Sequence, residues 1–190
     1  MNWEQLEHAI RAACDVANEE VVIVFGSQAI LGSHPDASNQ LRQSMEVDIA
    51  PGSNDSHVAD RIDGALGEDS VFNATHGFYV HGLTIDAALF PAGWERRTVK
   101  VRGSQAGPGT GLCIEAHDLA ASKLAAFREK DRDFVRTLLV DRLVNARKLR
   151  LRVQQLPPSR IPADRLLSWL DATVREIHRD PPAGDEGEPQ

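Results

Sequence analysis

The spacing of apolar residues near the N-terminus predicts a helix followed by a strand. In residues 3–20 the apolar positions recur three and four apart, as on one face of an amphipathic helix. The β-branched run 21–25 has the length and composition of a strand. Gly26-Ser27 interrupts this run, and residues 28–31 are predicted to start a short helix.

Alternating and apolar stretches farther along predict the rest of a sheet. Residues 45–50 alternate between apolar and polar side chains, as a half-buried strand does. The mixed apolar stretch 71–80 predicts a strand with a bend, and 83–90 predicts a second strand. Shorter strands are predicted over 98–102, at a charge-rich sheet edge, and over 112–114.

The remaining periodic segments predict helices and two irregular regions. The expected helices span residues 56–66, 116–130, 131–153 and 164–178. The glycine-rich stretch 103–111 has no lysine in the register of a phosphate-binding loop, which favours a flexible connector. The composition from residue 180 onward predicts a disordered tail.

This element order indicates an α/β (α+β) protein with a mixed central sheet flanked by helices and followed by a C-terminal helical segment. We expect a catalytic core over residues 1–115, a helical region over 116–179 that packs on the core, and the tail over 180–190. A chain of 190 residues is long enough for one buried core.

Composition narrows the class of protein. No apolar run approaches the ~18 residues of a membrane span, and the N-terminus lacks a signal-peptide layout, so we expect a soluble cytoplasmic protein without membrane contact. Cys14 and Cys113 are interpreted as small core residues, without zinc-site spacing.

The net charge of −7 argues against a protein coated in nucleic acid. Basic clusters over 96–102 and 142–152 leave a local polyanion-binding patch or a solvated helix face as alternatives.

Three acidic residues form the first candidate site. Glu46 and Asp48 are two apart in a predicted strand, so their side chains project from the same face. Neighbouring carboxylates repel each other, and a divalent cation, Mg²⁺ or Mn²⁺, would relieve that repulsion. Asp86 adds a carboxylate within an apolar stretch, where an acid is costly unless it is paired or metal-bound. The alternative is that these acids face solvent on a half-exposed sheet.

Other residues extend the candidate site or fall outside it. Lys123 lies on the apolar stripe of helix 116–130, where it either snorkels to the rim or points at an anion; an unbroken helix would place Asp131 near the same face. Ser104 and Ser122 have no evident partner base for a hydrolytic triad. The histidines without metal-ligand spacing, interpreted as loop or surface residues, are His34, His57, His76, His81 and His117.

These residues together resemble the site of the nucleotidyltransferase fold. Proteins of that fold carry a hydrophobic-Gly-Ser turn, an acidic-hydrophobic-acidic strand and a third acid, which look like residues 25–27, residues 46–48 and Asp86. The segment 118–135 is similar to a helical segment in a bacterial branch that includes AbiEii-like and MenT-like toxins of toxin–antitoxin systems. The likeness covers about residues 20–140. The Ser27–Glu46 interval is longer than usual, which predicts an inserted loop at the mouth of the site.

The resemblance implies a role for each matching residue. The acids Glu46, Asp48 and Asp86 would bind metal, and Gly26 and Ser27 would hold the triphosphate. Lys123 would contact the nucleotide. The late family aspartate would correspond to Asp131 or Asp133.

The leading hypothesis is a metal-dependent enzyme that moves a nucleoside monophosphate from a nucleoside triphosphate (NTP) to an acceptor hydroxyl. Asp86 would be the general base. By resemblance, the acceptor is the 3′ end of tRNA and the protein is a toxin with a cognate antitoxin. The alternatives are transfer to a protein or a small molecule, and a non-catalytic nucleotide-binding or antitoxin-like partner-binding module.

Overall fold

The computed structural model describes residues 1–102 and 109–179. The predicted tail (180–190) and most of the predicted glycine-rich connector (103–108) lie outside the described residues.

The first helix, α1 (Trp3–Ala17), begins where the sequence supplies a cap. The Asn2 side chain accepts a hydrogen bond from the Gln5 backbone at 2.8 Å, and the Gln5 side chain accepts one from the Asn2 backbone at 2.9 Å. Asn18, in the left-handed conformation (φ 56°), ends the helix. Strand β1 (Val21–Phe25) follows, so the predicted helix and strand are both confirmed.

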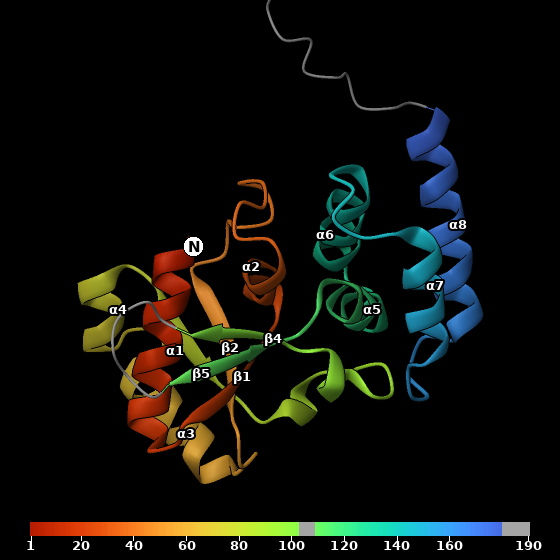
Figure 1. The fold of residues 1–190 in the computed structure, drawn as a ribbon. Coiled ribbons are helices and arrows are strands. Elements are labelled where there is room, and N and C mark those ends of the chain that lie inside the picture. The colour runs from red at the N-terminus through yellow and green to blue at the C-terminus, as the bar shows by residue number, and fades with distance from the viewer. Residues whose placement is uncertain (103–108, 180–190) are drawn as a thin grey trace, which may run out of the picture.

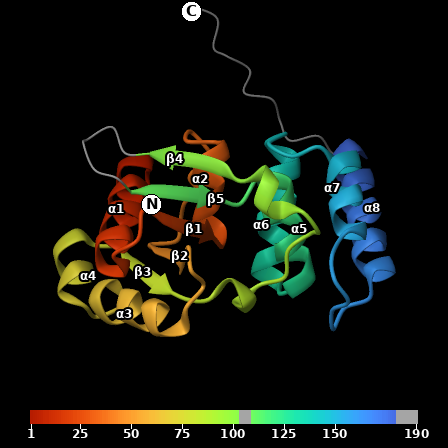
Figure 2. The same ribbon diagram turned by 60° about the horizontal axis from the view of Figure 1, so that its bottom comes forward.

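Five strands form one mixed sheet in the order β3-β2-β1-β5-β4 (Figures 1 and 2). Strand β1 runs antiparallel to β2 and parallel to β5, while β2 and β3 are parallel and β4 and β5 antiparallel. This sheet confirms the predicted α/β class, and β4 confirms the predicted edge strand. The other strands are β2 (Glu46–Pro51), β3 (Tyr79–Gly82), β4 (Val99–Arg102) and β5 (Thr110–Cys113).

The two faces of the sheet differ. The strand register aligns Val24, Ile49 and Cys113 on one face, where all three side chains are fully buried. The helices α1, α2 (Ile30–Ser33) and α3 (Ser56–Leu66) pack over this face (Figures 1 and 2). Glu46 and Asp48, at alternate positions of β2, belong to the other face and stay partly exposed. The candidate carboxylates therefore lie outside the apolar core.

Four helices at the C-terminal side lie beside the end of the sheet (Figure 2). Contacts join α5 to α6 and α7, and α8 to α6 and α7. A buried carboxylate, Asp118, ties this group together by accepting from Arg97 at 2.7 Å and pairing with Arg152 at 2.9 Å. The helices are α5 (Ala116–Ala126), α6 (Glu129–Val140), α7 (Ala146–Gln154) and α8 (Ala163–Arg179).

The predicted strand over 71–80 is wrong for most of its length. Residues 71–76 form the short helix α4 (Val71–His76), because the Ser70 side chain caps its first turn by accepting from the Asn73 backbone at 3.1 Å. Gly77 ends the helix in the left-handed conformation (φ 71°). Only Tyr79–Gly82 joins the sheet, as β3.

The predicted strand over 83–90 is also wrong. The Leu83 amide makes one more bond to the Ile49 carbonyl, at 3.0 Å, and the chain then leaves the sheet. A 3₁₀ turn, Ile85–Ala87, follows, and the Asn54 side chain accepts from the Ile85 amide at 2.8 Å. This bond supplies the partner that a neighbouring strand would have given. Asp86 consequently lies on an exposed turn and not within a strand.

The helices predicted over 116–130 and 131–153 are divided differently in the structure. Helix α5 ends at Ala126, where Phe127 caps it in the left-handed conformation (φ 54°), and α6 begins at Glu129. Helix α6 ends near Arg142, also left-handed (φ 56°), and the Asn145 side chain caps α7. The second predicted helix is therefore wrong as a single element.

Two smaller observations concern burial and membranes. Cys14 and Cys113 are both buried free thiols, as predicted for small core residues. Burial raises the pKa of the Cys113 thiol to about 12, which keeps it protonated and unreactive. Among residues 1–102 and 109–179, none of the helices has both the length and the apolar character required to cross a bilayer.

Candidate functional site

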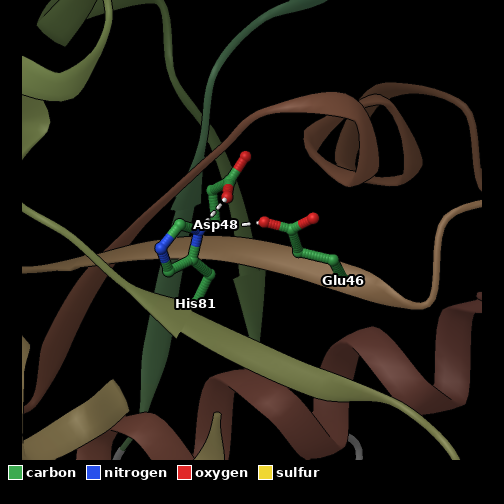
Figure 3. Close-up of side chains that lie close together, drawn as sticks. All are labelled: Glu46, Asp48 and His81. Carbon is green, nitrogen blue, oxygen red and sulfur yellow. Dashed lines mark hydrogen bonds and ion pairs between the residues drawn. The ribbon is translucent and has the colours of Figure 1, made fainter. Parts of the chain in front are cut away.

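Glu46 and Asp48 lie side by side on the half-open face of β2, where both carboxylates point toward His81 on β3 (Figure 3). The His81 Nδ1 atom is 2.9 Å from Glu46 Oε1 and 3.3 Å from Asp48 Oδ1. The parallel pairing of β2 with β3 sets Asp48 directly opposite His81. We call these three residues the carboxylate side of the site.

Gly26 brings the backbone after β1 against the carboxylate side. Its φ of 65° and ψ of −168° lie in a region that is essentially restricted to glycine. A Cβ atom at this position would stand 1.9 Å from Asp48 Oδ2, which no real contact allows. Ser27 then begins a short 3₁₀ turn, Ser27–Ala29, that continues into α2. The glycine is thus required both by conformation and by the Asp48 side chain.

The groups around the carboxylate side do not fully compensate the negative charge of its two carboxylates. Burial, and after it the neighbouring Glu46 carboxylate, raise the pKa of Asp48 to about 6, although Lys123 and His81 act in the opposite direction. Glu46 and His81 are still partly open to solvent. Two carboxylates and an imidazole that converge in this way are a donor set that fits a divalent cation.

Lys123, Arg128 and Asp131, which we call the cation side, come from α5 and the start of α6. Asp131 is 1% exposed, and its Oδ2 accepts from Arg128 Nε at 2.6 Å. Its Oδ1 lies 3.2 Å from Arg128 Nη2 and 3.6 Å from Lys123 Nζ. The turn at Phe127 folds the chain back, so Asp131 meets Lys123 although the helix between them is broken. One buried carboxylate therefore positions two cationic groups.

Lys123 connects the two sides electrostatically. Burial lowers its pKa, whereas the carboxylates of Asp131 and Asp48 favour the charged form. Its ammonium group also lies 5.5 Å from the centre of the Phe134 ring, within cation–π range. Lys123 is therefore held at the cavity and does not snorkel out to solvent.

A cavity of about 550 Å³ lies between these groups. Every residue that the sequence nominated for the site lines it, together with His81, Arg128 and Lys130. The nominated residues are Gly26, Ser27, Glu46, Asp48, Asp86, Lys123 and Asp131. Asp133, the alternative to Asp131, is exposed and is not part of the lining. The catalytic and binding roles of these residues stay predictions.

Asp86 is separated in the structure from the other two acids. Its Oδ2 accepts from the Asn54 side chain at 3.2 Å, and its side chain is exposed at the cavity rim. The convergent metal-ligand group found in residues 1–102 and 109–179 contains Glu46, Asp48 and His81, but not Asp86. The geometry thus favours His81 over Asp86 beside the acidic pair.

Two of the histidines interpreted as loop or surface residues have structural surroundings that the sequence did not reveal. His81 lies in a strand and belongs to the carboxylate side. His117 is buried, lies 2.7 Å from Glu115 through Nδ1, and accepts from the Asn145 amide through Nε2 at 2.9 Å. The alternation of His81 with buried Val80 and Gly82 was the available signal, but it gave no information about the neighbouring strand.

Some members of both basic clusters are paired with acidic residues within the fold. Lys148 pairs with Glu115 at 3.0 Å, and Arg150 pairs with Asp171. Arg97 and Arg152 both pair with Asp118, as described above. These four residues join helices to one another and are therefore less available to bind a polyanion.

The residues that match a known protein family include both sides of the cavity. Residues 3–158 match DUF6036, a family described as a nucleotidyltransferase of unknown function. No curated protein and no solved structure matches the chain. The family match includes every residue of the carboxylate side and of the cation side.

Proposed function

The chain belongs to the DUF6036 family of nucleotidyltransferases, and from this premise we propose that it transfers a nucleoside monophosphate from an NTP to an acceptor hydroxyl. The observation that carries the proposal is a carboxylate side and a cation side around one cavity. Such a cavity has groups for both the metal and the phosphates of a metal–nucleotide complex. Glu46 and Asp48 would hold the divalent cation, Mg²⁺ or Mn²⁺.

The cation side suits the triphosphate. Lys123 and Arg128 are both fixed by Asp131 and both line the cavity. Arg128 presents a guanidinium that matches phosphate geometry, while Lys123 supplies a compact charge. The turn at Gly26 and Ser27 allows close approach of the backbone to the same phosphates.

The reaction requires a bond from the acceptor oxygen to the α-phosphorus and loss of pyrophosphate. When bound, the cation neutralises charge that develops on the phosphates and polarises them toward attack. Asp86, at the cavity rim, would accept the proton of the acceptor hydroxyl, and Asn54 would hold its carboxylate in place. Lys123 and Arg128 would stabilise the departing pyrophosphate.

For the acceptor we propose the 3′ end of tRNA, and for the cellular role a toxin with a cognate antitoxin. The support is the similarity of segment 118–135 to the AbiEii-like and MenT-like branch. Arg128 and Lys130 line the cavity, and we assign these two residues to contact with the acceptor strand.

The decisive experiment uses each of the four α-labelled NTPs with Mg²⁺ or Mn²⁺ and three acceptor pools: total tRNA, total protein and small molecules. Label on tRNA supports the proposal as stated, while label on protein or in a low-mass product replaces only the acceptor. If no label moves from any NTP to any pool, the enzymatic proposal is overturned.

The Asp48→Asn variant separates catalysis from simple nucleotide binding. A transferase loses label transfer in this variant, and a toxin also loses its effect on growth. Nucleotide binding or partner binding that is unchanged in Asp48→Asn, without transfer by the wild type, would instead identify a non-catalytic module.

A further inference from the structure

We propose that His81 is the third protein ligand of the cation at Glu46 and Asp48, and that this ligand makes the site select Mn²⁺ over Mg²⁺. The inference rests on the proposed function only in assigning the cation to this cavity. It replaces the third carboxylate that the sequence predicted, Asp86, with an imidazole from a neighbouring strand.

The distances within the carboxylate side fit a common ion. Two adjacent ligands, each about 2.1 Å from an octahedral ion, lie about 3 Å apart. His81 Nδ1 is 2.9 Å from Glu46 Oε1 and 3.3 Å from Asp48 Oδ1. One ligand atom from each of the three residues lies within 4.8 Å of the others. The three donors can therefore occupy one face of an octahedron without rearrangement of the strands.

The strand pairing holds His81 in this position. Residues of β3 pair in parallel with β2, so that Asp48 faces His81 and Glu46 faces Tyr79. The side chains of all three ligands project from the same face of the sheet. Figure 3 shows the imidazole directed at both carboxylates. A ligand fixed by two adjacent strands loses little conformational freedom when a cation binds.

The other acids that line the cavity have different partners. Asp86 is exposed and accepts from Asn54, outside the convergent group. Asp131 is buried between Arg128 and Lys123, and those two cations compensate its charge. Within the described residues that line the cavity, His81 is thus the group best placed to complete the set.

The imidazole nitrogen of His81 determines which divalent cation the site prefers. Mg²⁺ prefers oxygen donors and retains its water, whereas affinity for nitrogen-containing sites rises along the series that begins with Mn²⁺. Two carboxylates keep the set hard enough for Mn²⁺, and one imidazole disfavours Mg²⁺. The open positions of the octahedron are left for phosphate oxygens.

The test measures cation binding directly, with the metal alone and no nucleotide. Electron paramagnetic resonance gives the Mn²⁺ affinity, and spin-echo modulation detects a ¹⁴N ligand of the bound ion. We expect ¹⁴N modulation in the wild-type protein and its loss in His81→Ala, together with a Mn²⁺ affinity reduced about tenfold or more. His57→Ala, which removes an exposed histidine on α3, is the matched control and should keep both signals.

The His81→Asp variant tests selectivity in a protein that still binds metal. It restores three oxygen donors, so the ratio of Mg²⁺ to Mn²⁺ affinity should increase about tenfold. If the wild type binds Mn²⁺ without ¹⁴N modulation, or if His81→Asp leaves the ratio unchanged, the proposal is overturned. These results do not depend on transfer activity, so failure here is distinct from failure of the proposed function. If the wild-type protein binds Mn²⁺ through nitrogen but transfers no nucleotide, only the proposed function is overturned.

Discussion

The two sides of the cavity are built in different ways. On the carboxylate side, Glu46 and Asp48 are placed by the alternation of one strand, and His81 by its register with the next. On the cation side, Lys123 and Arg128 are placed by ion pairs to a single buried residue, Asp131. Backbone hydrogen bonds fix the first side, and side-chain charge fixes the second.

This difference indicates how each side should fail. A neutral isostere on the carboxylate side leaves the strand pairing intact, so it should remove chemistry while it preserves the fold. A neutral isostere at Asp131 removes the charge that organises two cations, so it should affect stability and nucleotide binding together. Substitutions on each side of the cavity therefore test that distinction.

Asp48→Asn should abolish transfer without loss of stability. We expect the rate to fall ~10³-fold or more, because one of the two proposed carboxylate ligands is lost. In the metal-free protein at pH 7 the free energy of unfolding should rise by about 1–2 kcal/mol, since the raised pKa of Asp48 indicates a charge that the fold disfavours. Label transfer and urea unfolding measure the two effects. A variant that is both inactive and markedly less stable would contradict the strand-based account of this side.

Gly26→Ala should damage the same side through the backbone. Its backbone conformation costs a non-glycine residue about 1–3 kcal/mol, and the new Cβ would displace the Asp48 carboxylate. We therefore expect a loss of stability in that range and a decrease in transfer of roughly 100-fold. Gly64→Ala, in α3, is the control, because a Cβ there meets no atom within 4 Å. Equal effects of the two substitutions would show that the Gly26 contact is unimportant.

Asp131→Asn should weaken the cation side. Lys123, whose side chain is 13% exposed, would keep its charge without its nearest partner, which costs up to about 3 kcal/mol by comparison with other broken buried pairs. Transfer should fall mainly through a KM for NTP that is about tenfold higher, because Lys123 and Arg128 lose their fixed positions. Asp133→Asn, at an exposed position on the same helix, should change the KM for NTP by less than about twofold. It should change the free energy of unfolding by less than about 0.5 kcal/mol. A larger effect at Asp133 would identify that residue as the late family aspartate.

The features of the fold and of the site that could be predicted from the sequence are those that a local pattern encodes. The pair Glu46 and Asp48 could be placed on one face from alternation alone, and Lys123 could be placed on an inward stripe from helical periodicity. Both patterns are local. The fold class could be predicted for the same reason, because most helices and strands of the sheet region, including α1, β1 and β2, carry their own period.

Several of the errors concern interactions between distant segments. Residues 83–90 have an apolar pattern that suits a strand, but the chain leaves the sheet after Gly82, and Asn54 supplies the hydrogen bond that replaces the ladder. His81 gained its position from the register of β3 on β2, which no local pattern encodes. Three basic residues of α7 are paired with Glu115, Asp118 and Asp171, whose proximity depends on helix packing.

The smallest expected effect concerns Glu115, which anchors the helix that carries Lys123. Its carboxylate caps α5 and accepts from Lys148 of α7 at 3.0 Å. Burial alone would raise the pKa of Glu115, but hydrogen bonds from His117 and Lys148 outweigh it and lower the pKa to about 2. Because the folded pKa is below the unfolded value of 4.5, this carboxylate stabilises the fold above pH 4.5, and the contribution is lost as pH falls toward 2.

Glu115→Gln should therefore lower the free energy of unfolding by about 1–2 kcal/mol at pH 7, and the difference from wild type should shrink between pH 4.5 and pH 2. Denaturant unfolding at pH 7, 5 and 3 measures this difference. Glu129→Gln, at an exposed position of α6, should show a small difference at each pH. A Glu115→Gln difference that stays constant down to pH 3 would mean that the cap acts by shape and not by charge. In that case the positions of Lys123 and Arg128 would depend on the charge of Asp131 and not on the charge of Glu115.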